Sequence, residues 1–370
     1  MKKQSVHVIT YCILLLITGL FWVGNAVHAE NEGSKTLQNK ELVSSEAKND
    51  LDVKKIVFDH IEDSYEWHVA TIGDVHLTIP LPVILKGQDG KWNIFLSSEF
   101  HHAPNGIYKG FYISNQGINE GKIVERNAEG EEIRPLNLSL TKTAAGILIG
   151  SIVLISIILS CSRWAARNPN KAPGGFIGFM ELFIMDINDN VVKACIGPKY
   201  RKFSPYLLTA FFFIFFNNII GLIPIFPGGS NVTGNITVTL VLAVCTFIIT
   251  NISGSKEYYK DIVWPHVPTA LKPIMIPIEI IGVFTKPFAL MIRLFANMMA
   301  GHSVILCLIC IIFITATMGV VLNTSMTVVS VLFCVFMNLL EVLVAYIQAY
   351  VFTMLSAVFI GLAVGEPELE

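Results

Sequence analysis

The stretch KPFALMIRLFANMMAGHSVI, residues 286–305, has the apolar texture of a membrane helix, yet it carries side chains that lipid does not favour. They are Lys286, Arg293, Asn297 and His302. Arg293 lies well inside the apolar run, where inserting an arginine costs about 2.5–3.5 kcal/mol on a cellular insertion scale. A charge retained at that cost indicates an ion path or a counter-charge for a moving ion.

The composition of the whole chain agrees with a membrane protein. Of its 370 residues, 53% are hydrophobic and 15% are charged, with a mean hydropathy of +0.60. A soluble domain has about 25% charged residues. The net charge of -2 and the lack of a basic tract give no reason to expect a nucleic-acid partner.

The cysteines and histidines predict neither a disulfide framework nor a metal site. Cys12 lies in the leader and the other six cysteines follow residue 160. Cys307 and Cys310 have CxxC spacing but lie in an apolar helix, which favours packing over metal or redox use. His101 and His102 have no second ligand motif nearby, so we expect a solvated pair.

The amino terminus is typical of a secretory signal. Lys2 and Lys3 precede an apolar stretch, and Val27-His28-Ala29 is a plausible cleavage site. We therefore assign residues 1–29 to a signal peptide, although the long apolar run leaves an uncleaved anchor as an alternative. Either way, the residues that follow should be exported from the cytoplasm.

Residues 30–142 form the predicted exported region. Residues 30–55 are polar and predicted to be disordered. Between about residues 57 and 124 the pattern changes to strand-like runs, with GQDG (87–90) as a hairpin turn between the first two. These runs are HLTIPLPVIL (76–85), KWNIFLSS (91–98) and YKGFYIS (108–114). A small β-rich region is expected.

The membrane domain should occupy residues 143–370. The first span begins near Thr143, and the segment from Arg163 to Lys202 holds seven Lys or Arg against three Asp or Glu. The positive-inside rule places that loop in the cytoplasm. Within it, residues 174–195 form an amphipathic segment that we expect along the membrane interface.

Four further apolar segments complete an all-α polytopic domain of about five spans. Two of ordinary length cover residues 204–226 and 236–252, and two longer ones cover residues 273–314 and 324–364. The longer two exceed the roughly 20 residues of a perpendicular span, so they should be tilted or partly in-plane. This count places the amino terminus outside and the carboxyl terminus in the cytoplasm.

Charges in the first long segment recur every seven residues, at Lys272, Glu279, Lys286 and Arg293. Because two helical turns differ from seven residues by only about 20°, they form one stripe. Asn297 stays close to that stripe. For Lys272 and Lys286, snorkelling toward the lipid headgroups remains an alternative explanation.

His302 follows Arg293 by nine residues, so it should point to the opposite side of the helix. In the last segment, Glu341 is the only charged residue between Ser303 and Gly365, and Asn338 and Gln348 are expected to share its face. A carboxylate and an imidazole on adjacent membrane helices are typical of a proton relay.

At these residues the chain resembles subunit a of the F-type ATP synthase. The family core Arg-Leu-Phe-x-Asn-Met-x-x-Gly stands here as residues 293–301. The resemblance extends to Lys286-Pro287, to residues 348–352 (QAYVF), and to Asn218, Gly221, Pro224 and Asn235. It covers roughly residues 143–364, and several spaced motifs in order make it specific.

The resemblance implies a non-catalytic, proton-translocating subunit without a cofactor. Arg293 would face a rotating ring of subunit c, with Gln348 nearby, and would favour a deprotonated ring carboxylate. Glu279, Asn297, His302 and Glu341 would line two aqueous half-channels. Asn218, Asn235, Lys286 and Asn338 are candidates for channel lining or helix packing. The ring supplies the ion site, so the coupling ion, H⁺ or Na⁺, is set outside this chain.

Implied partners are the subunit c ring, the stator subunit b, the remaining ATP synthase subunits and the lipid of a bacterial inner membrane. Family members place one acid and one histidine at the positions of His302 and Glu341, in either order. Two features depart from the family: residues 30–142 are longer than it needs, and Gly221 stands where some members have an acid.

Two other classes of protein compete with this assignment. A free-standing secondary transporter would predict matching broken helices in two halves, whereas the charges here cluster in the last two segments. An exported binding protein with a simple anchor would not require charges inside the anchor.

Overall fold

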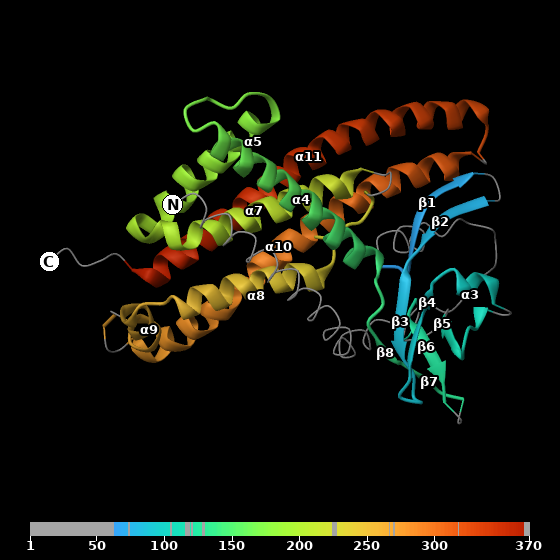
Figure 1. Ribbon diagram of the computed structural model, residues 1–370, viewed down its shortest axis with the longest axis horizontal. Helices are drawn as coiled ribbons and strands as arrows, with labels where there is room; N and C mark the ends of the chain where they lie inside the picture. Colours follow the sequence, from blue (N-terminus) through green and yellow to red (C-terminus); the bar gives the residue numbers. More distant parts are fainter. Residues whose placement is uncertain are drawn as a thin grey trace.

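The computed structural model describes residues 63–365, except for 73–74, 104–105, 115–118, 120, 128–129, 224–227, 266, 269–270 and 317. The predicted signal peptide (1–29), the predicted disordered stretch (30–55) and Pro224 lie outside the described residues. A β-rich region lies at one end of a long helical part (Figure 1).

The helical part begins where the sequence predicts the first span. Its elements are α4 (Lys142–Arg167), α5 (Gly175–Asp186), a π-helical turn (Ile187–Val192), α6 (Lys193–Ile196), a 3₁₀ turn (Gly197–Lys199), α7 (Tyr200–Leu222), α8 (Ile236–Ile252), α9 (Lys256–Val263), α10 (Lys272–Thr315) and α11 (Val320–Val364).

These helices confirm the predicted count of about five spans. Among the described residues, four helical stretches are long and apolar enough to cross a membrane, and the bent pair of α8 and α9 provides a fifth. The two members of that pair meet at 103°. Helix α9, which was not predicted, forms in the short polar stretch after residue 252.

Helix α7 packs against its neighbours through buried aromatic side chains. Phe211, Phe212 and Phe213 are each at most 2% exposed. The ring of Phe211 stacks on that of Phe215, and both rings contact Tyr346 of α11 edge-on. Packing of this kind fixes α11 against α7.

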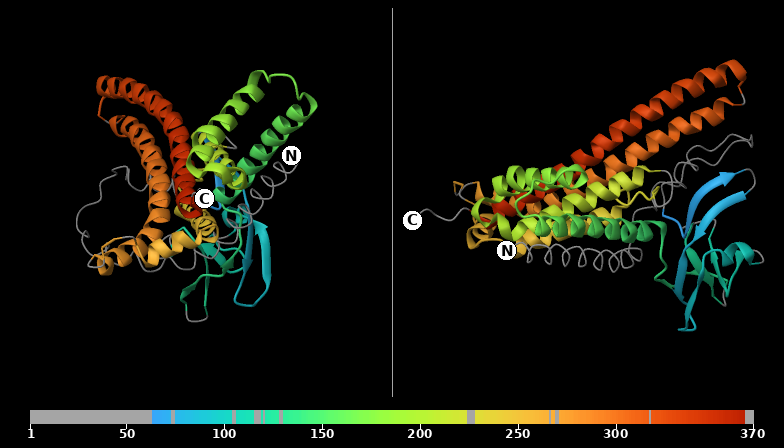
Figure 2. Two further views of the ribbon diagram at one scale, coloured as in Figure 1. Left: turned by 90° about the vertical axis from the view of Figure 1, so that its left-hand side faces the viewer. Right: turned by 45° about the horizontal axis from the view of Figure 1, so that its top comes forward.

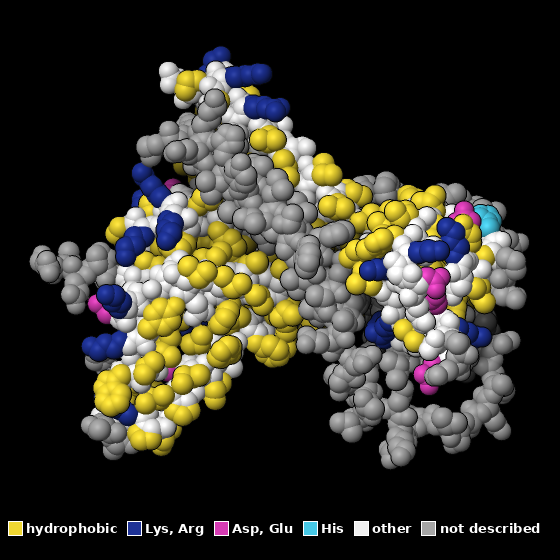
Figure 3. Space-filling model, turned by 60° about the horizontal axis from the view of Figure 1, so that its bottom comes forward, with side chains coloured by type: hydrophobic (Ala, Val, Ile, Leu, Met, Phe, Trp, Pro, Cys, Tyr) yellow, Lys and Arg dark blue, Asp and Glu magenta, His cyan; other side chains and the backbone are white. Residues whose placement is uncertain are grey.

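The two longest helices, α10 and α11, form a hairpin that is much less buried than α7. Its outer half leans away from the other helices, as Figure 2 shows. Only 17% of the apolar membrane-spanning stretch of each of these helices is buried, against 67% of the corresponding stretch that contains α7. Figure 3 shows broad hydrophobic surface over the helical part, with Lys and Arg toward its edges.

Helix α5 presents an apolar face to its surroundings. Phe176, Phe179, Leu182 and Met185 are all more than half exposed, at a spacing close to one helical turn. This pattern fits the predicted position along the membrane interface, which stays a prediction.

Within the described residues, the β-rich region contains three small antiparallel sheets. Their orders are β1-β2, β4-β3-β8 and β5-β6-β7. The elements are β1 (Glu66–Ile72), β2 (Val75–Pro80), β3 (Pro82–Lys86), β4 (Trp92–Leu96), α3 (Glu99–His102), β5 (Phe111–Ile113), β6 (Ile123–Arg126), β7 (Glu132–Ile133) and β8 (Leu136–Asn137).

The predicted hairpin turn at residues 87–90 is confirmed, since it joins β3 to β4. Gly90 has a φ of 70°, which glycine adopts readily. The single predicted strand at residues 76–85 is wrong, because β2 pairs with β1 whereas β3 pairs with β4. Pro80 and Pro82 have no N–H to donate to a continuous ladder, and this separates the strands.

The β-rich region is anchored to the helical part through Trp67. This residue is 2% exposed, packs with Leu81 and Ala145, and donates its indole N–H to the carbonyl of Gly228 at 3.2 Å. The start of α4 is held by the backbone of Ser64, which accepts from the amide of Lys142. The loop before α8 and the start of α4 therefore meet at this junction.

Candidate functional site

A buried pair of ionisable groups joins α10 to α11. His302 Nδ1 lies 3.4 Å from Glu341 Oε1, and the two side chains are 19% and 7% exposed. Neither this nitrogen nor either carboxylate oxygen has a hydrogen-bond partner within the described part of the chain. The predicted juxtaposition of these two residues is present. Both groups keep free hydrogen-bonding capacity within the described residues, and an acid and an imidazole are the usual side chains in proton transfer.

Gly301 brings the two helices close enough for this contact. A Cβ added at Gly301 would lie 2.2 Å from Glu341 Oε1 and 3.1 Å from Cδ. Glu341 therefore packs directly against the backbone of α10, in the space that any larger residue would fill. From the sequence, Gly301 was recognised only as part of the family core, and this role was not predicted.

Arg293 and Asn297 occupy exposed positions on α10. Within the described residues Arg293 has no ion pair, and no hydrogen bond joins it to Gln348. Gln348 itself is buried, 8% exposed, on α11. The structure thus places His302 against α11 and leaves Arg293 uncovered, consistent with their predicted separation around the helix.

Asn338 departs from its predicted place. It is exposed and donates its side-chain amide to the carbonyl of Cys334 in its own helix, at 2.9 Å. Glu341, by contrast, is buried. Three residues on an α-helix fall about 60° short of a full turn, and here that offset separates the exposed and buried faces.

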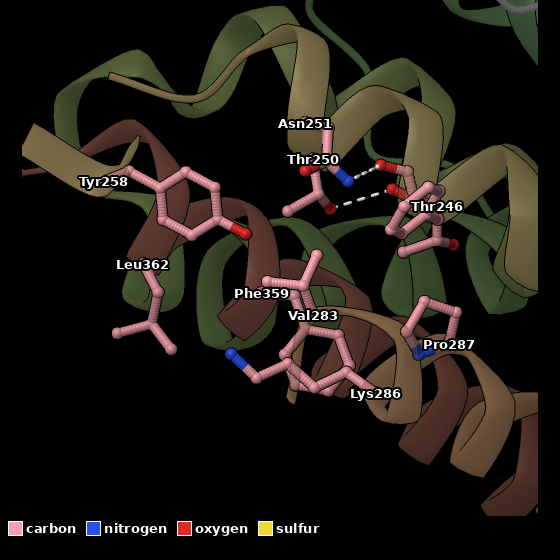
Figure 4. Close-up of a pocket in the computed structure, with 10 residues that line it drawn as sticks. Thr246, Thr250, Asn251, Tyr258, Val283, Lys286, Pro287, Phe359 and Leu362 are labelled. Carbon is pink, nitrogen blue, oxygen red and sulfur yellow. Dashed lines mark hydrogen bonds between the residues drawn. The ribbon is translucent and has the colours of Figure 1, made fainter. Parts of the chain in front are cut away.

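Lys286 lines a pocket between α8, α9, α10 and α11, together with polar side chains. Figure 4 shows Thr250, Asn251 and Tyr258 on the wall of this pocket opposite Lys286. The ammonium nitrogen of Lys286 lies 5.8 Å from the ring centroid of Phe359. Glu279, one stripe position earlier, is half-buried.

Lys272 lies at the first position of α10, with its ammonium 3.8 Å from the ring centroid of Trp264. This places it at the predicted entrance of the helix. Such a contact between a cation and an aromatic face is stabilising and needs no transport role.

The two other candidate asparagines differ in role. Asn235 caps α8, because its side chain accepts from the amide of Thr237 at 3.0 Å. This cap accounts for Asn235 structurally. Asn218 is 1% exposed on α7 and accepts a hydrogen bond from the hydroxyl of Thr233.

Asn218 lies at about the depth of Glu341. Helices α7 and α11 run antiparallel (Figure 1), and their contacts define matching levels. Tyr206 reaches Ser356 through the hydroxyl of Thr246, and further along Phe211 and Phe215 contact Tyr346. Glu341 lies five residues before Tyr346 on α11, and Asn218 lies about five residues beyond the middle of Phe211 and Phe215 on α7. Because both helices rise about 1.5 Å per residue, the two polar side chains lie at about the same level.

The described residues contain no group of three or more His, Cys, Asp or Glu placed to hold a metal ion. His101 Nε2 instead contacts Glu66 at 2.8 Å, and His102 is exposed. Cys307 and Cys310 are free, the first exposed and the second buried.

An uncovered arginine on a long apolar hairpin, next to a buried histidine–glutamate pair, defines a polytopic membrane protein that moves ions. Residues 147–361 match the family model described as ATP synthase A chain. Residues 56–142 match a domain of unknown function, DUF8433.

Similar proteins carry the same description. The chain is 46% identical over 237 residues to an ATP synthase subunit a of Chlorobium phaeobacteroides, covering 63% of this chain and 67% of that protein. It is 38% identical over 248 residues to the subunit a of Myxococcus xanthus, covering 64% and 78%. The chain therefore belongs to the F-type ATP synthase subunit a family, and it is a non-catalytic, proton-translocating subunit of the membrane sector.

Proposed function

We propose that the exposed face of α10 around Arg293 is the surface on which the ring of subunit c turns. The observation that carries this proposal is the uncovered Arg293, which has no ion pair among the described residues, on a hairpin that is itself mostly unburied. A guanidinium in lipid requires a counter-charge, and a ring carboxylate supplies one. Asn297 is exposed one turn further along α10, in reach of the same partner.

Protons reach and leave the ring through two offset half-channels in this proposal. His302 and Glu341 form the wall of one, since they lie in contact, Glu341 is buried, and the facing nitrogen and both carboxylate oxygens have no hydrogen bond within the described residues. Lys286, which lines the pocket of Figure 4, and Glu279, seven residues earlier on α10, border the other. Arg293 stays charged and separates the two, and Gln348 assists from α11. Stator subunit b and the remaining ATP synthase subunits complete the complex.

The test replaces Arg293. Arg293→Ala should abolish ATP-driven proton pumping in membrane vesicles while the complex still assembles. Arg293→Lys should fail too, because a lysine lacks the planar fork of arginine and can lose its proton when buried. Arg201→Ala, which removes an exposed arginine at the start of α7, is the matched control and should pump normally. Normal coupled pumping by Arg293→Ala would contradict the proposal.

We also propose that the β-rich region lies outside the bacterial inner membrane and that the carboxyl terminus is cytoplasmic. Support comes from the excess of Lys and Arg between Arg163 and Lys202, at the opposite end of α4. Protease added to intact spheroplasts should remove residues 30–142 and spare the rest. Protection of that region in intact cells, with cleavage in inverted vesicles, would reverse the orientation.

A further inference from the structure

One face of the sheet β4-β3-β8 is apolar and exposed. Side chains alternate between the two faces of a strand, and paired residues of neighbouring strands share a face. Val83 and Leu85 of β3, with Phe95 of β4, lie on the buried face. The other face, named here the outer face, is formed by Pro82, Ile84, Lys86, Trp92, Ile94, Leu96 and Leu136.

The composition of the outer face is unusual for strands that face water. Along β4, Trp92, Ile94 and Leu96 are 52%, 67% and 48% exposed, and Leu136 of β8 is 56% exposed. An antiparallel sheet with one solvated face normally carries polar residues on that face. Within the described residues β4 is also an edge strand, and edge strands in water are commonly protected by charges. A contiguous apolar surface of this kind marks a site of interaction with a protein or a membrane.

The outer face begins where the protein enters the membrane. Residues 138–141 alone separate β8 from α4, the first span. Leu138 donates its backbone amide to the carbonyl of Ile84 at 2.9 Å. Leu140 donates to that of Pro82 at 3.0 Å, so pairing with β3 continues almost to the start of α4. Even fully extended, this connection spans at most about 18 Å, which keeps the sheet close to the membrane surface.

The arrangement of the β-rich region turns the outer face toward that surface. The opposite face of the sheet is covered by α3 and by the sheet β5-β6-β7, through Phe100, Phe111 and Ile123. Figure 1 shows α3 and β5 farther from the helical part than β3, and it shows β3 running across the direction of the helices. A bilayer around the helices therefore meets the sheet along the length of its strands, on the outer face.

The charges at one end of the outer face fit a phospholipid surface. The ammonium of Lys86 lies 5.8 Å from the ring centroid of Trp92, and Lys91 is exposed beside it in the sequence. Asp89, in the turn between the two lysines, is the one opposing charge in that turn. Tryptophan is enriched at the boundary between lipid chains and headgroups. Lysine stems cover apolar surface while their ammonium groups reach polar surroundings, here the lipid phosphates.

We propose that the outer face docks on the lipid surface of the membrane that the helices span. Trp92, Ile94 and Leu96 lie among the headgroups, and the two lysines lie at the phosphates of anionic lipids. The contact is continuous with the exposed apolar surface of α4, where Ile152 is 63% exposed. Together with the hydrogen bond of Trp67, it attaches the β-rich region at two places, one on the helical part and one on lipid. This docking is independent of the ring-facing function proposed above.

Photo-cross-linking in the assembled ATP synthase complex identifies what covers the outer face. Ile94 is replaced by the photoreactive amino acid benzoylphenylalanine, and the complex is reconstituted into vesicles of phosphatidylcholine and phosphatidylglycerol. After illumination, mass spectrometry should find a phospholipid adduct at position 94. Ile107 is the matched control, because it is an exposed isoleucine in the loop after α3. The same replacement there should give no lipid adduct.

Other partners of the cross-link overturn the proposal. An adduct with residues 30–62 of the same chain would show that this segment covers the outer face. An adduct with a second copy of the chain or with another subunit would show a protein interface. The lack of a lipid adduct at position 94, or equal lipid adducts at positions 94 and 107, would show that the outer face does not dock on lipid.

A second measurement tests the lysines. In vesicles that contain phosphatidylglycerol, Lys86→Gln combined with Lys91→Gln should lower the yield of the lipid adduct at position 94 by about fivefold or more, because one lysine near an anionic surface contributes about fivefold in affinity. In vesicles of phosphatidylcholine alone, the same change should have no effect. An unchanged yield in the anionic vesicles overturns the assignment of the lysines to lipid phosphates.

Discussion

Helix α7 and the hairpin of α10 and α11 use polar residues in opposite ways. Beyond Lys202 the polar side chains on α7 are uncharged, and several are hydrogen-bonded inside the protein, as Tyr206 is to Thr246. The hairpin carries charges inside its apolar run, and Arg293 is exposed without an ion pair among the described residues. Helix α7 is therefore covered mostly by other helices of this chain, whereas the hairpin leaves most of its apolar surface uncovered.

Among variants of the hairpin and of α7 other than those of Arg293, we expect the largest loss of proton pumping from exchanging His302 or Glu341. His302→Glu or Glu341→His would leave two acids or two imidazoles in contact, and like groups in a low dielectric disfavour each other's ionisation. Each single variant should lose pumping by about a hundredfold, the scale of a lost acid–base group. The double swap restores one of each and should recover much of the flux.

A double-mutant cycle on ATP-driven proton pumping in vesicles measures this coupling. If the two single losses simply add in the double swap, the residues act independently and the shared channel is excluded.

The next effect concerns the glycine beneath Glu341. Gly301→Ala would place a methyl group against the carboxylate and force it away from His302. Pumping should fall about tenfold, because displacing a reacting group by about 1 Å can cost as much or more. Gly282→Ala is the matched control on the same helix, where an added Cβ meets nothing within 4 Å. Equal pumping by both variants would show that the close contact has no role.

The smallest effect on transport is expected from two phenylalanines, one buried on α7 and one exposed on α11. The buried one should have the largest effect on stability. Phe211→Ala removes a fully buried ring and should lower the free energy of unfolding by about 3–5 kcal/mol. Phe333→Ala removes a ring that is 52% exposed on α11, and should change it by less than about 0.5 kcal/mol in the isolated subunit. Thermal unfolding in detergent distinguishes the two. A similar loss of unfolding free energy in both variants would show that α7 and the hairpin do not differ in burial.

The sequence predicted the spans and the charged candidates well because charge inside an apolar run is rare and costly. Arg293, His302 and Glu341 stand out on that ground alone, and helical spacing separated the first two. The contact between Gly301 and Glu341 could not be predicted, since it depends on how two helices approach in space. Asn338 was placed on the wrong face because an offset of about 60° is invisible until the partner helix is fixed.

The β-rich region was predicted less well. Strand-like runs and the turn at residues 87–90 were recognisable locally. The split between β2 and β3 depends on their different partner strands, and the pair of prolines that marks it was read as part of one strand. Ser151 and Asn217, whose buried oxygens have no hydrogen bond within the described residues, were not predicted either, since uncharged residues in a span carry no strong signal.

The hydrogen bond between Trp67 and Gly228 also constrains the order in which the protein can be made. Its partners are 161 residues apart. A ribosome adding about 5–20 residues per second needs on the order of 8–30 seconds to travel that distance. During this interval the earlier segment waits without its acceptor, while α4 and α7 enter the membrane. This bond can therefore close only after α4 and α7 have been made, and its closure requires that the β-rich segment and the loop before α8 lie on the same side of the membrane.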